Sequence, residues 1–222
     1  MILDGTKSMK ESPPKTTQEK FWLSDFGEEY LKRNLTYDDF NNLYKKETGF
    51  NADTPFQDFF EDLDKNISIL EFGCNSGIKL EILKNLGFKN LTGIDINKKA
   101  LEMAQKRYPE INFIHSTIDD LILKGNKYDL IFTSLVLIHQ NPQLVNSVIS
   151  KIVGISKKYI FGYEYFSDNL TEIEYRGHKN VLWKQNFVEL FKKNHPSLKL
   201  VKEQKYHYLK NDLVDIAYLF EK

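Results

Sequence analysis

The segment at residues 69–77, ILEFGCNSG, places a carboxylate, two glycines and an asparagine where a short apolar run gives way to a helical pattern. Glycine lets the backbone approach a ligand closely, and the N–H groups of the following helix point toward the same place. A bound phosphate would meet the like charge of Glu71 at close range, whereas an amine would be attracted to it. The segment therefore predicts a binding turn for a small ligand that carries an amine.

A second acid lies at a fitting distance from this turn. Asp95, in GIDI, follows Gly73 by 22 residues, an interval that suits a carboxylate reaching both hydroxyls of a bound ribose. Nicotinamide enzymes use such an acid too, but their G-x-G-x-x-G turn binds a pyrophosphate, whereas this turn presents Glu71. S-adenosylmethionine (SAM) has a ribose, an ammonium and a sulfonium but no phosphate, so we expect SAM here. The alternative is a glycine-rich turn that binds nothing.

The elements that position these residues alternate along the chain from residue 66. Apolar runs predict five strands, namely NISILEFG, LTGIDI, INFIHS, KYDLIFTSLVL and KKYIFGYEYF. Helical patterns lie between them at residues 77–86, 97–108 and 142–154, with Asn97 as an N-cap and Pro142 at a first helical position.

A further helix and a hairpin complete the predicted fold. The helix is marked by Trp183, Phe187, Leu190 and Phe191 and stopped by Pro196, and the hairpin consists of LKLVKEQKYHY and LVDIAYLFEK. Strands joined by helices indicate an α/β fold whose mostly parallel sheet carries helices on both faces, with a C-terminal antiparallel hairpin strand. In such sheets the ligand binds at the carboxyl ends of the strands.

The first 65 residues differ in character from the rest. Residues 1–16 form a tail rich in Pro, Lys and Thr, which we expect to be flexible. QEKFWLSDFGEEYLKRN and YDDFNNLYKKETGF predict two aromatic-rich amphipathic helices within residues 17–65, an N-terminal helical lid over the sheet. Most of their aromatic residues, such as Trp22, are interpreted as docking residues. Residues 66–222 then form the main domain.

Composition narrows the classes of function. A chain of 222 residues with 41% hydrophobic residues is expected to form one globular unit. Lys+Arg and Asp+Glu are both 31, so no nucleic-acid partner is expected. The single cysteine, Cys74, forms no internal disulfide and predicts no metal site. No stretch has the length and apolarity of a signal peptide or a membrane span, so we expect a cytoplasmic protein without a membrane partner. The oligomeric state stays open.

Several motifs occur in an order that resembles a known family. ILEFGCNSG, GIDIN, KYDLIFTSLVLIHQNP, KYIFGYEYF, EYRGH and LWKQNF, preceded by FG-x-x-Y-x-x-RN, are similar to the pseudaminic acid biosynthesis-associated methylases. These form a bacterial branch of the class I SAM-dependent methyltransferases. The resemblance covers nearly the whole chain after the tail. It implies a Rossmann-like fold, S-adenosylhomocysteine as product, and a sugar or nucleotide-sugar acceptor of the nonulosonic-acid type from surface-glycan biosynthesis.

The resemblance also implies roles for individual residues around SAM. The methionine part would be held by Glu71, Gly73, Asn75 and Gly77, and the ribose by Asp95 and Ile96. The adenine would be flanked by Thr117 and Ile118, although Thr117 stands where an aspartate is common in the wider superfamily. The methyl-transfer centre would be lined by Thr133, Ser134 and Leu135, and the SAM carboxylate would be covered by Tyr30 and Arg33.

The acceptor is expected beside the fourth and fifth strands. His139 and His178 are the candidate general bases, because imidazole titrates near neutral pH; His139 could instead simply bond to backbone at its strand-to-helix junction. The acceptor itself is expected to contact Tyr163, Glu164, Tyr165, Tyr175 and Arg176. For Arg176, an ion pair with a neighbouring glutamate is the alternative. Alternative functions are a methyltransferase for another small metabolite, a non-catalytic SAM-binding regulator and a nicotinamide oxidoreductase.

Overall fold

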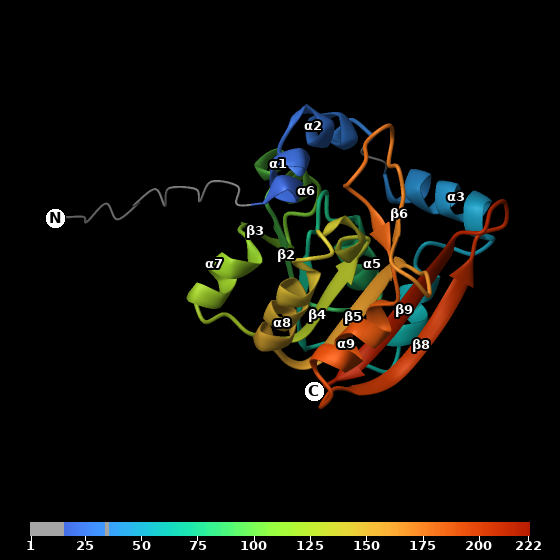
Figure 1. Ribbon diagram of the computed structural model, residues 1–222. Coiled ribbons are helices and arrows are strands. Elements are labelled where there is room, and N and C mark those ends of the chain that lie inside the picture. The colour runs from blue at the N-terminus through green and yellow to red at the C-terminus, as the bar shows by residue number, and fades with distance from the viewer. Residues whose placement is uncertain (1–15, 34–35) are drawn as a thin grey trace.

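The computed structural model describes residues 16–33 and 36–222, and its centre is a seven-stranded sheet (Figure 1). The strands are β1 (Ser68–Phe72), β2 (Asn90–Asp95), β3 (Asn112–His115), β4 (Tyr128–Ser134), β5 (Ser156–Tyr165), β8 (Lys199–His207) and β9 (Val214–Glu221). Their order is β3-β2-β1-β4-β5-β9-β8, and β9 pairs antiparallel with both neighbours while the others pair in parallel. The predicted mostly parallel sheet with a closing hairpin is therefore confirmed.

Helices cover both faces of the sheet because successive side chains of each strand point to opposite faces. One face carries α7 (Ile118–Leu123), α8 (Val145–Ile155) and α9 (Phe187–Asn194). The other carries α3 (Tyr37–Thr48), α4 (Thr54–Phe60), α5 (Ile78–Asn85) and α6 (Lys98–Arg107). In β1, for example, Leu70 belongs to the first core and Ile69 to the second. Strands buried on both faces explain why the apolar runs are nearly continuous.

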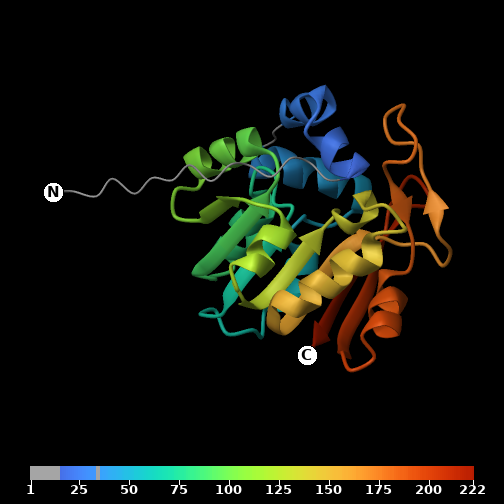
Figure 2. The same cartoon turned by 60° about the vertical axis from the view of Figure 1, so that its left-hand side comes forward.

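The N-terminal segment divides into two parts. The first predicted helix is two helices in the structure, α1 (Thr17–Trp22) and α2 (Asp25–Leu31), because Ser24 caps α2 by accepting a hydrogen bond from the N–H of Phe26. Figures 1 and 2 show both helices lying above the carboxyl ends of the parallel strands. In contrast, α4, which the sequence analysis did not predict, is part of the core: its Phe60 is fully buried against Phe161. Residues 1–15 of the expected tail lie outside the described residues.

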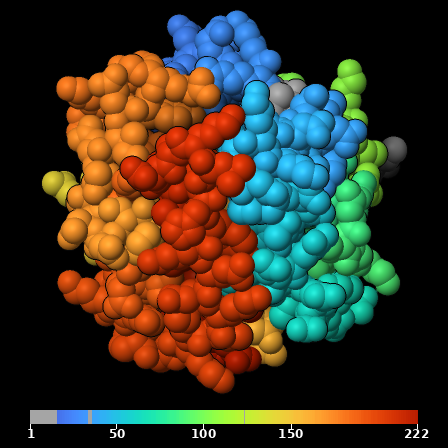
Figure 3. Space-filling view, turned by 90° about the vertical axis from the view of Figure 1, so that its right-hand side faces the viewer, coloured from blue at the N-terminus to red at the C-terminus, as the bar shows by residue number. Residues whose placement is uncertain are grey.

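The helix α3 lies beside the β8–β9 hairpin (Figure 3). The N–H of Leu209, in the hairpin turn, donates to the carbonyl of Glu47 over 2.8 Å. Near by, the hydroxyl of Tyr206 donates to Asp58 over 2.8 Å. These contacts attach the N-terminal segment to the last strands of the chain.

Three predicted boundaries were wrong. Trp183 is not helical: it pairs with Glu172 between the short strands β6 (Thr171–Glu172) and β7 (Trp183–Lys184), and α9 begins only after its N-cap Asn186. The fourth strand ends at Ser134 and is followed by the 3-10 helix η1 (Leu137–His139). Finally, α8 begins at Val145 rather than at Pro142. After β4 the apolar run continues through residues 135–138, past the point where the strand pairing ends, so the pattern alone could not place that boundary.

The packing of Gly162 gives a test of the fold. A Cβ on Gly162 would lie 2.1 Å from Cζ of the fully buried Tyr218. Gly162→Ala should therefore lower the free energy of unfolding by about 1–3 kcal/mol, measured by urea denaturation. Gly154→Ala on α8 is the matched control, because nothing lies within 4 Å of its added Cβ and alanine is favoured in helices by about 0.5–1 kcal/mol. Equal effects of the two substitutions would contradict this packing.

Candidate active site

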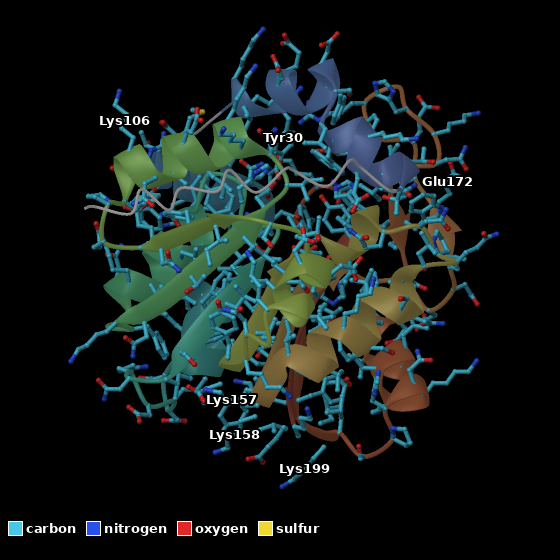
Figure 4. The ribbon with its side chains drawn as sticks, turned by 90° about the vertical axis from the view of Figure 1, so that its left-hand side faces the viewer. Tyr30, Lys106, Lys157, Lys158, Glu172 and Lys199 are labelled. Carbon is cyan, nitrogen blue, oxygen red and sulfur yellow. The ribbon has the colours of Figure 1, made fainter. Side chains whose placement is uncertain are left out.

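A cavity of about 480 Å³ opens at the carboxyl ends of β1, β2 and β4. Its walls come from these strand ends and from α1 and α2, including Trp22 and Tyr30. Figure 4 shows Tyr30 between the N-terminal helices and the sheet, whereas Lys157, Lys158 and Lys199 lie at the opposite end of the molecule. The volume lies within the range of about 300–1,000 Å³ typical of small-molecule sites.

The turn after β1 forms one wall of the cavity. Gly73 has a φ of 74°, and a Cβ there would lie 2.7 Å from a methyl group of Val136, so a side chain at this position has no room. Gly77, with a φ of 78°, lies outside the cavity lining and would place a Cβ against Phe113. Asn75 lines the cavity. The turn is thus shaped to bring bare backbone to the cavity.

Glu71 lies behind this turn rather than in the cavity lining. Its side chain is 1% exposed, and its Oε2 has no hydrogen-bond partner among the described residues. Burial raises the pKa of Glu71 to about 8, opposed by the positive charge of Lys79 and reinforced by Asp95. An unpartnered carboxyl oxygen in this position is suited to an ammonium group.

Asp95 ends β2 and faces the cavity beside the turn. Its Oδ2 accepts a hydrogen bond from the N–H of Asn75 (2.9 Å) and its Oδ1 one from the N–H of Asn97 (2.8 Å). Burial raises the pKa of Asp95, and these backbone hydrogen bonds oppose the rise. Each carboxylate oxygen can accept a further hydrogen bond, so Asp95 can bind two neighbouring hydroxyl groups.

The remaining residues predicted around SAM fall into two groups. The cavity lining includes Tyr30, Ile96, Thr117, Ile118, Ser134 and Leu135. Thr133 and Arg33 do not line it: Thr133 is buried and hydrogen-bonds Glu164, and Arg33 is exposed with its guanidinium carbon 6.0 Å from the Tyr30 ring centre. The strand ends therefore meet at one cavity as predicted, while these two side chains lie outside it.

His139 lies in the cavity wall at the end of η1. Its Nδ1 is 2.7 Å from the carbonyl oxygen of Val181, and since a carbonyl only accepts, Nδ1 carries the proton and Nε2 is left as an acceptor. Burial lowers the pKa of His139 to about 4, so the ring is neutral at pH 7. The ring centre lies 4.8 Å from that of Trp22 and 5.3 Å from that of Tyr175.

The residues predicted to contact the acceptor also fall into two groups, those in the cavity lining and those outside it. Tyr165 and Tyr175 line the cavity. Tyr163 and Glu164 are buried outside the lining, and the Tyr163 hydroxyl donates to Asp215 over 2.5 Å.

The two residues of the YRGH motif also lie outside the cavity lining. Arg176 and His178 are both exposed. The His178 ring packs against Phe21 and Phe26, with ring centres 5.1 Å apart in each pair. Of the two candidate bases, the structure brings only His139 to the cavity.

Several cavity residues were missed by the sequence analysis. They include Gln18, Phe72, Lys79, Asn97, Ser116, Val136 and Lys151, and Trp22 was interpreted as a docking residue. The hydrophobic pattern predicts only that Trp22 faces the protein, and it gives no means to tell a core contact from a cavity wall.

Two kinds of feature are absent from residues 16–33 and 36–222. No group of three or more His, Cys, Asp or Glu side chains there is arranged to hold a metal ion. No helix in the same residues is long and apolar enough to cross a membrane.

Comparison with known proteins gives a domain family and several relatives. Residues 69–158 match the family model of a methyltransferase domain. The ribosomal protein L11 methyltransferase of Dictyoglomus turgidum is 32% identical over 78 residues, which are 33% of this chain and 25% of that protein. The aligned regions span only 21–42% of the lengths of the curated relatives that the chain matches.

Two solved structures share the fold over nearly the whole chain. The 1,6-didemethyltoxoflavin-N1-methyltransferase of Burkholderia thailandensis, with S-adenosylhomocysteine bound, has a TM-score of 0.67 at 15% identity and covers 96% of this chain and 92% of its own. The magnesium protoporphyrin IX methyltransferase of Synechocystis, with SAM bound, has a TM-score of 0.64 at 13% identity and covers 95% and 100%. The predicted Rossmann-like fold is therefore confirmed, and residues 69–158 correspond to a methyltransferase domain.

Proposed function

We propose that this protein is a SAM-dependent methyltransferase that acts on a small molecule. The observation that carries the proposal is the single cavity into which the turn at Gly73, the ribose-type acid Asp95 and the neutral imidazole of His139 all open. The match of residues 69–158 to a methyltransferase domain supports the same reaction class.

The residues present fit SAM on three points. The carboxyl group of Glu71, with its unpartnered Oε2 buried behind the turn, would attract the ammonium. The free acceptor positions of Asp95 would bind the ribose hydroxyls, and the bare backbone at Gly73 leaves room for the methionine part. When bound, SAM supplies a methyl carbon already activated by a positively charged sulfur. The protein then has to hold the acceptor atom in line and exclude water, with Trp22 and Tyr30 closing the cavity.

His139 is the residue we propose as general base. It is neutral at pH 7, and the bond from Nδ1 to Val181 turns Nε2 into the proton acceptor. A general base contributes about 100-fold to 10,000-fold to the rate when the attacking group must lose a proton. His178, which packs against the lid helices, would instead contribute to their docking.

The acceptor class is proposed from the family resemblance and from the residues of the cavity wall. The family resemblance favours a sugar or nucleotide sugar of surface-glycan biosynthesis. The rings of Trp22, Tyr30, Tyr165 and Tyr175 in the cavity wall offer flat apolar surfaces on which a ring-shaped acceptor can stack. The same rings also suit a second candidate, a planar ring compound that is not a sugar; the similar Burkholderia enzyme has 1,6-didemethyltoxoflavin bound. A cavity enclosed by α1 and α2 favours a small molecule over a protein substrate in either case.

Binding of S-adenosylhomocysteine tests the cofactor assignment. It should raise the melting temperature of the wild-type protein, as a ligand bound to the folded state does, and NAD should not. Asp95→Ala should lose about 1.5–3 kcal/mol of binding free energy by calorimetry, because charged hydrogen bonds to the ribose are removed. Asp212→Ala, an exposed change in the β8–β9 turn, is the control. Unchanged affinity in Asp95→Ala would exclude the ribose role.

The raised pKa of Glu71 leads us to expect that SAM binding releases a proton. With a pKa of about 8 it is mostly protonated at pH 7 in the free protein, and the ammonium of SAM favours its ionised form, so binding should expel the proton. Calorimetry at pH 7 in two buffers of different ionisation enthalpy measures this release. We expect a large fraction of one proton for wild type and almost none for Glu71→Gln. Equal proton release by both proteins would remove Glu71 from the ammonium site.

The two histidines are separated by their effects on turnover. A panel of free sugars and nucleotide sugars, incubated with SAM and read by mass for one added methyl, first identifies an acceptor. With that acceptor, His139→Ala should lower kcat about 100-fold or more while S-adenosylhomocysteine affinity persists. His178→Ala should retain most of kcat. The opposite ranking would assign the base to His178, and methylation only of a protein or tRNA would refute the acceptor class.

A further inference from the structure

The chain makes an abrupt turn where β4 leaves the sheet. The N–H of Leu135 still donates to the carbonyl of Tyr163 on β5 over 2.8 Å, but Leu135 has a φ of 58°, which is rare outside glycine. Beyond it, the N–H groups of residues 136–138 belong neither to a strand pair nor to the interior of a helix. Backbone N–H groups buried at such a place need an acceptor from elsewhere in the fold.

Glu164, on β5 beside this turn, supplies that acceptor. It is fully buried, its Oε1 lies 3.3 Å from the N of Val136, and its Oε2 lies 3.3 Å from the N of Ile138. The N–H of Leu137 and the side chain of Thr133 also hydrogen-bond it. A single carboxylate therefore binds three successive backbone N–H groups, as an anion does at the start of a helix.

The segment that Glu164 holds forms the central wall of the cavity. Leu135, Val136, Ile138 and His139 all line it. The Val136 side chain packs so closely on the turn after β1 that it occupies the space of a Cβ on Gly73. The position of this segment consequently sets both the contact with the glycine turn and the location of His139.

We infer that Glu164 is a positioning residue, whose buried carboxylate holds residues 136–138 and thereby fixes the cavity wall and His139. The catalytic part of this inference, the placement of His139 as a base, rests on the proposed function. It replaces the contact with the acceptor that the sequence analysis expected for Glu164. Glutamine has the same shape as glutamate but cannot accept all of these hydrogen bonds, because its NH₂ group would face one of the N–H donors.

The ionisation state of Glu164 gives a readout that a purely structural role would lack. Burial raises the pKa of Glu164 to about 7, and the hydrogen bonds that its carboxylate accepts oppose this rise. The titratable group facing it from β9 is the Tyr218 hydroxyl, which stays neutral because burial raises the pKa of Tyr218 as well. As the pH falls through about 7, protonation of Glu164 should weaken the hydrogen bonds that it accepts from the N–H groups of Val136 and Ile138.

Hydrogen exchange on the ligand-free protein tests this inference directly. In wild type the amides of Val136 and Ile138 should be protected above pH 7, and their protection factors should fall several-fold by pH 6, relative to core amides such as that of Phe161. In Glu164→Gln their protection should be at least tenfold lower at pH 8 and independent of pH. Glu203→Gln, the same change at an exposed position on β8, should behave as wild type.

The affinity for S-adenosylhomocysteine tests whether Glu164 also affects ligand binding. Glu164→Gln should bind it at least tenfold more weakly than wild type and Glu203→Gln, while still melting cooperatively. Wild-type protection factors that do not change between pH 6 and 8, or equal protection and affinity in Glu164→Gln, would overturn the inference. If Glu164→Gln does not fold, the wild-type pH series decides alone. Failure of wild type to bind S-adenosylhomocysteine would instead refute the proposed function and leave the exchange result standing.

Discussion

The candidate site depends on the hydrogen bonds of one carboxylate, that of Asp95. One of its oxygens accepts from Asn75 in the turn after β1, and the other accepts from Asn97, the N-cap of α6. The N–H groups of Gly73 and Cys74 also donate to the strand β2, at the carbonyl of Ile94. These hydrogen bonds hold two strand-to-helix junctions together at the same edge of the sheet. The Asp95 carboxylate can still accept further hydrogen bonds from a ligand.

Ionisation of the buried carboxyl groups works against the stability of the fold. Burial raises the pKa of Glu71 and of Asp215 to about 8 and that of Glu164 to about 7. A pKa that is higher in the folded state means that stability present at low pH is lost as the pH rises through it. His139 acts in the opposite direction: its pKa is lowered to about 4, so stability falls as the pH drops from about 6.5 toward 4. Clusters of such groups are typical of functional sites.

The aromatic residues of the N-terminal helices connect this site to the segment after β5. Trp22 packs against His139 and Tyr30, and Phe26 packs against Tyr175. The side-chain amide of Gln18 donates to a backbone carbonyl at residue 180 over 3.3 Å. These contacts enclose the cavity from the side that the sheet leaves open, where water would otherwise enter.

The local pattern of the sequence determined the strands, most of the helices and the glycine turn after β1. Apolar runs of strand length, the cap at Asn97 and the spacing from Gly73 to Asp95 depend on residues that are close along the chain, so they could be recognised without the fold. The same patterns could not place the end of β4 or assign Trp183 to a strand, because an apolar residue fits a strand, a helix or a tight turn equally well.

Only the tertiary structure decided which polar side chains reach the cavity. His139 and His178 are both plausible bases in the sequence, and Glu164 and Tyr165 are neighbours in one motif. Side chains alternate along β5, so Tyr165 faces the cavity while Glu164 is turned to the backbone after β4. The packing of α1 and α2 leaves His178 exposed beside Phe21 and encloses His139 beneath Trp22. These outcomes depend on contacts between distant segments, which residue types and spacing do not encode.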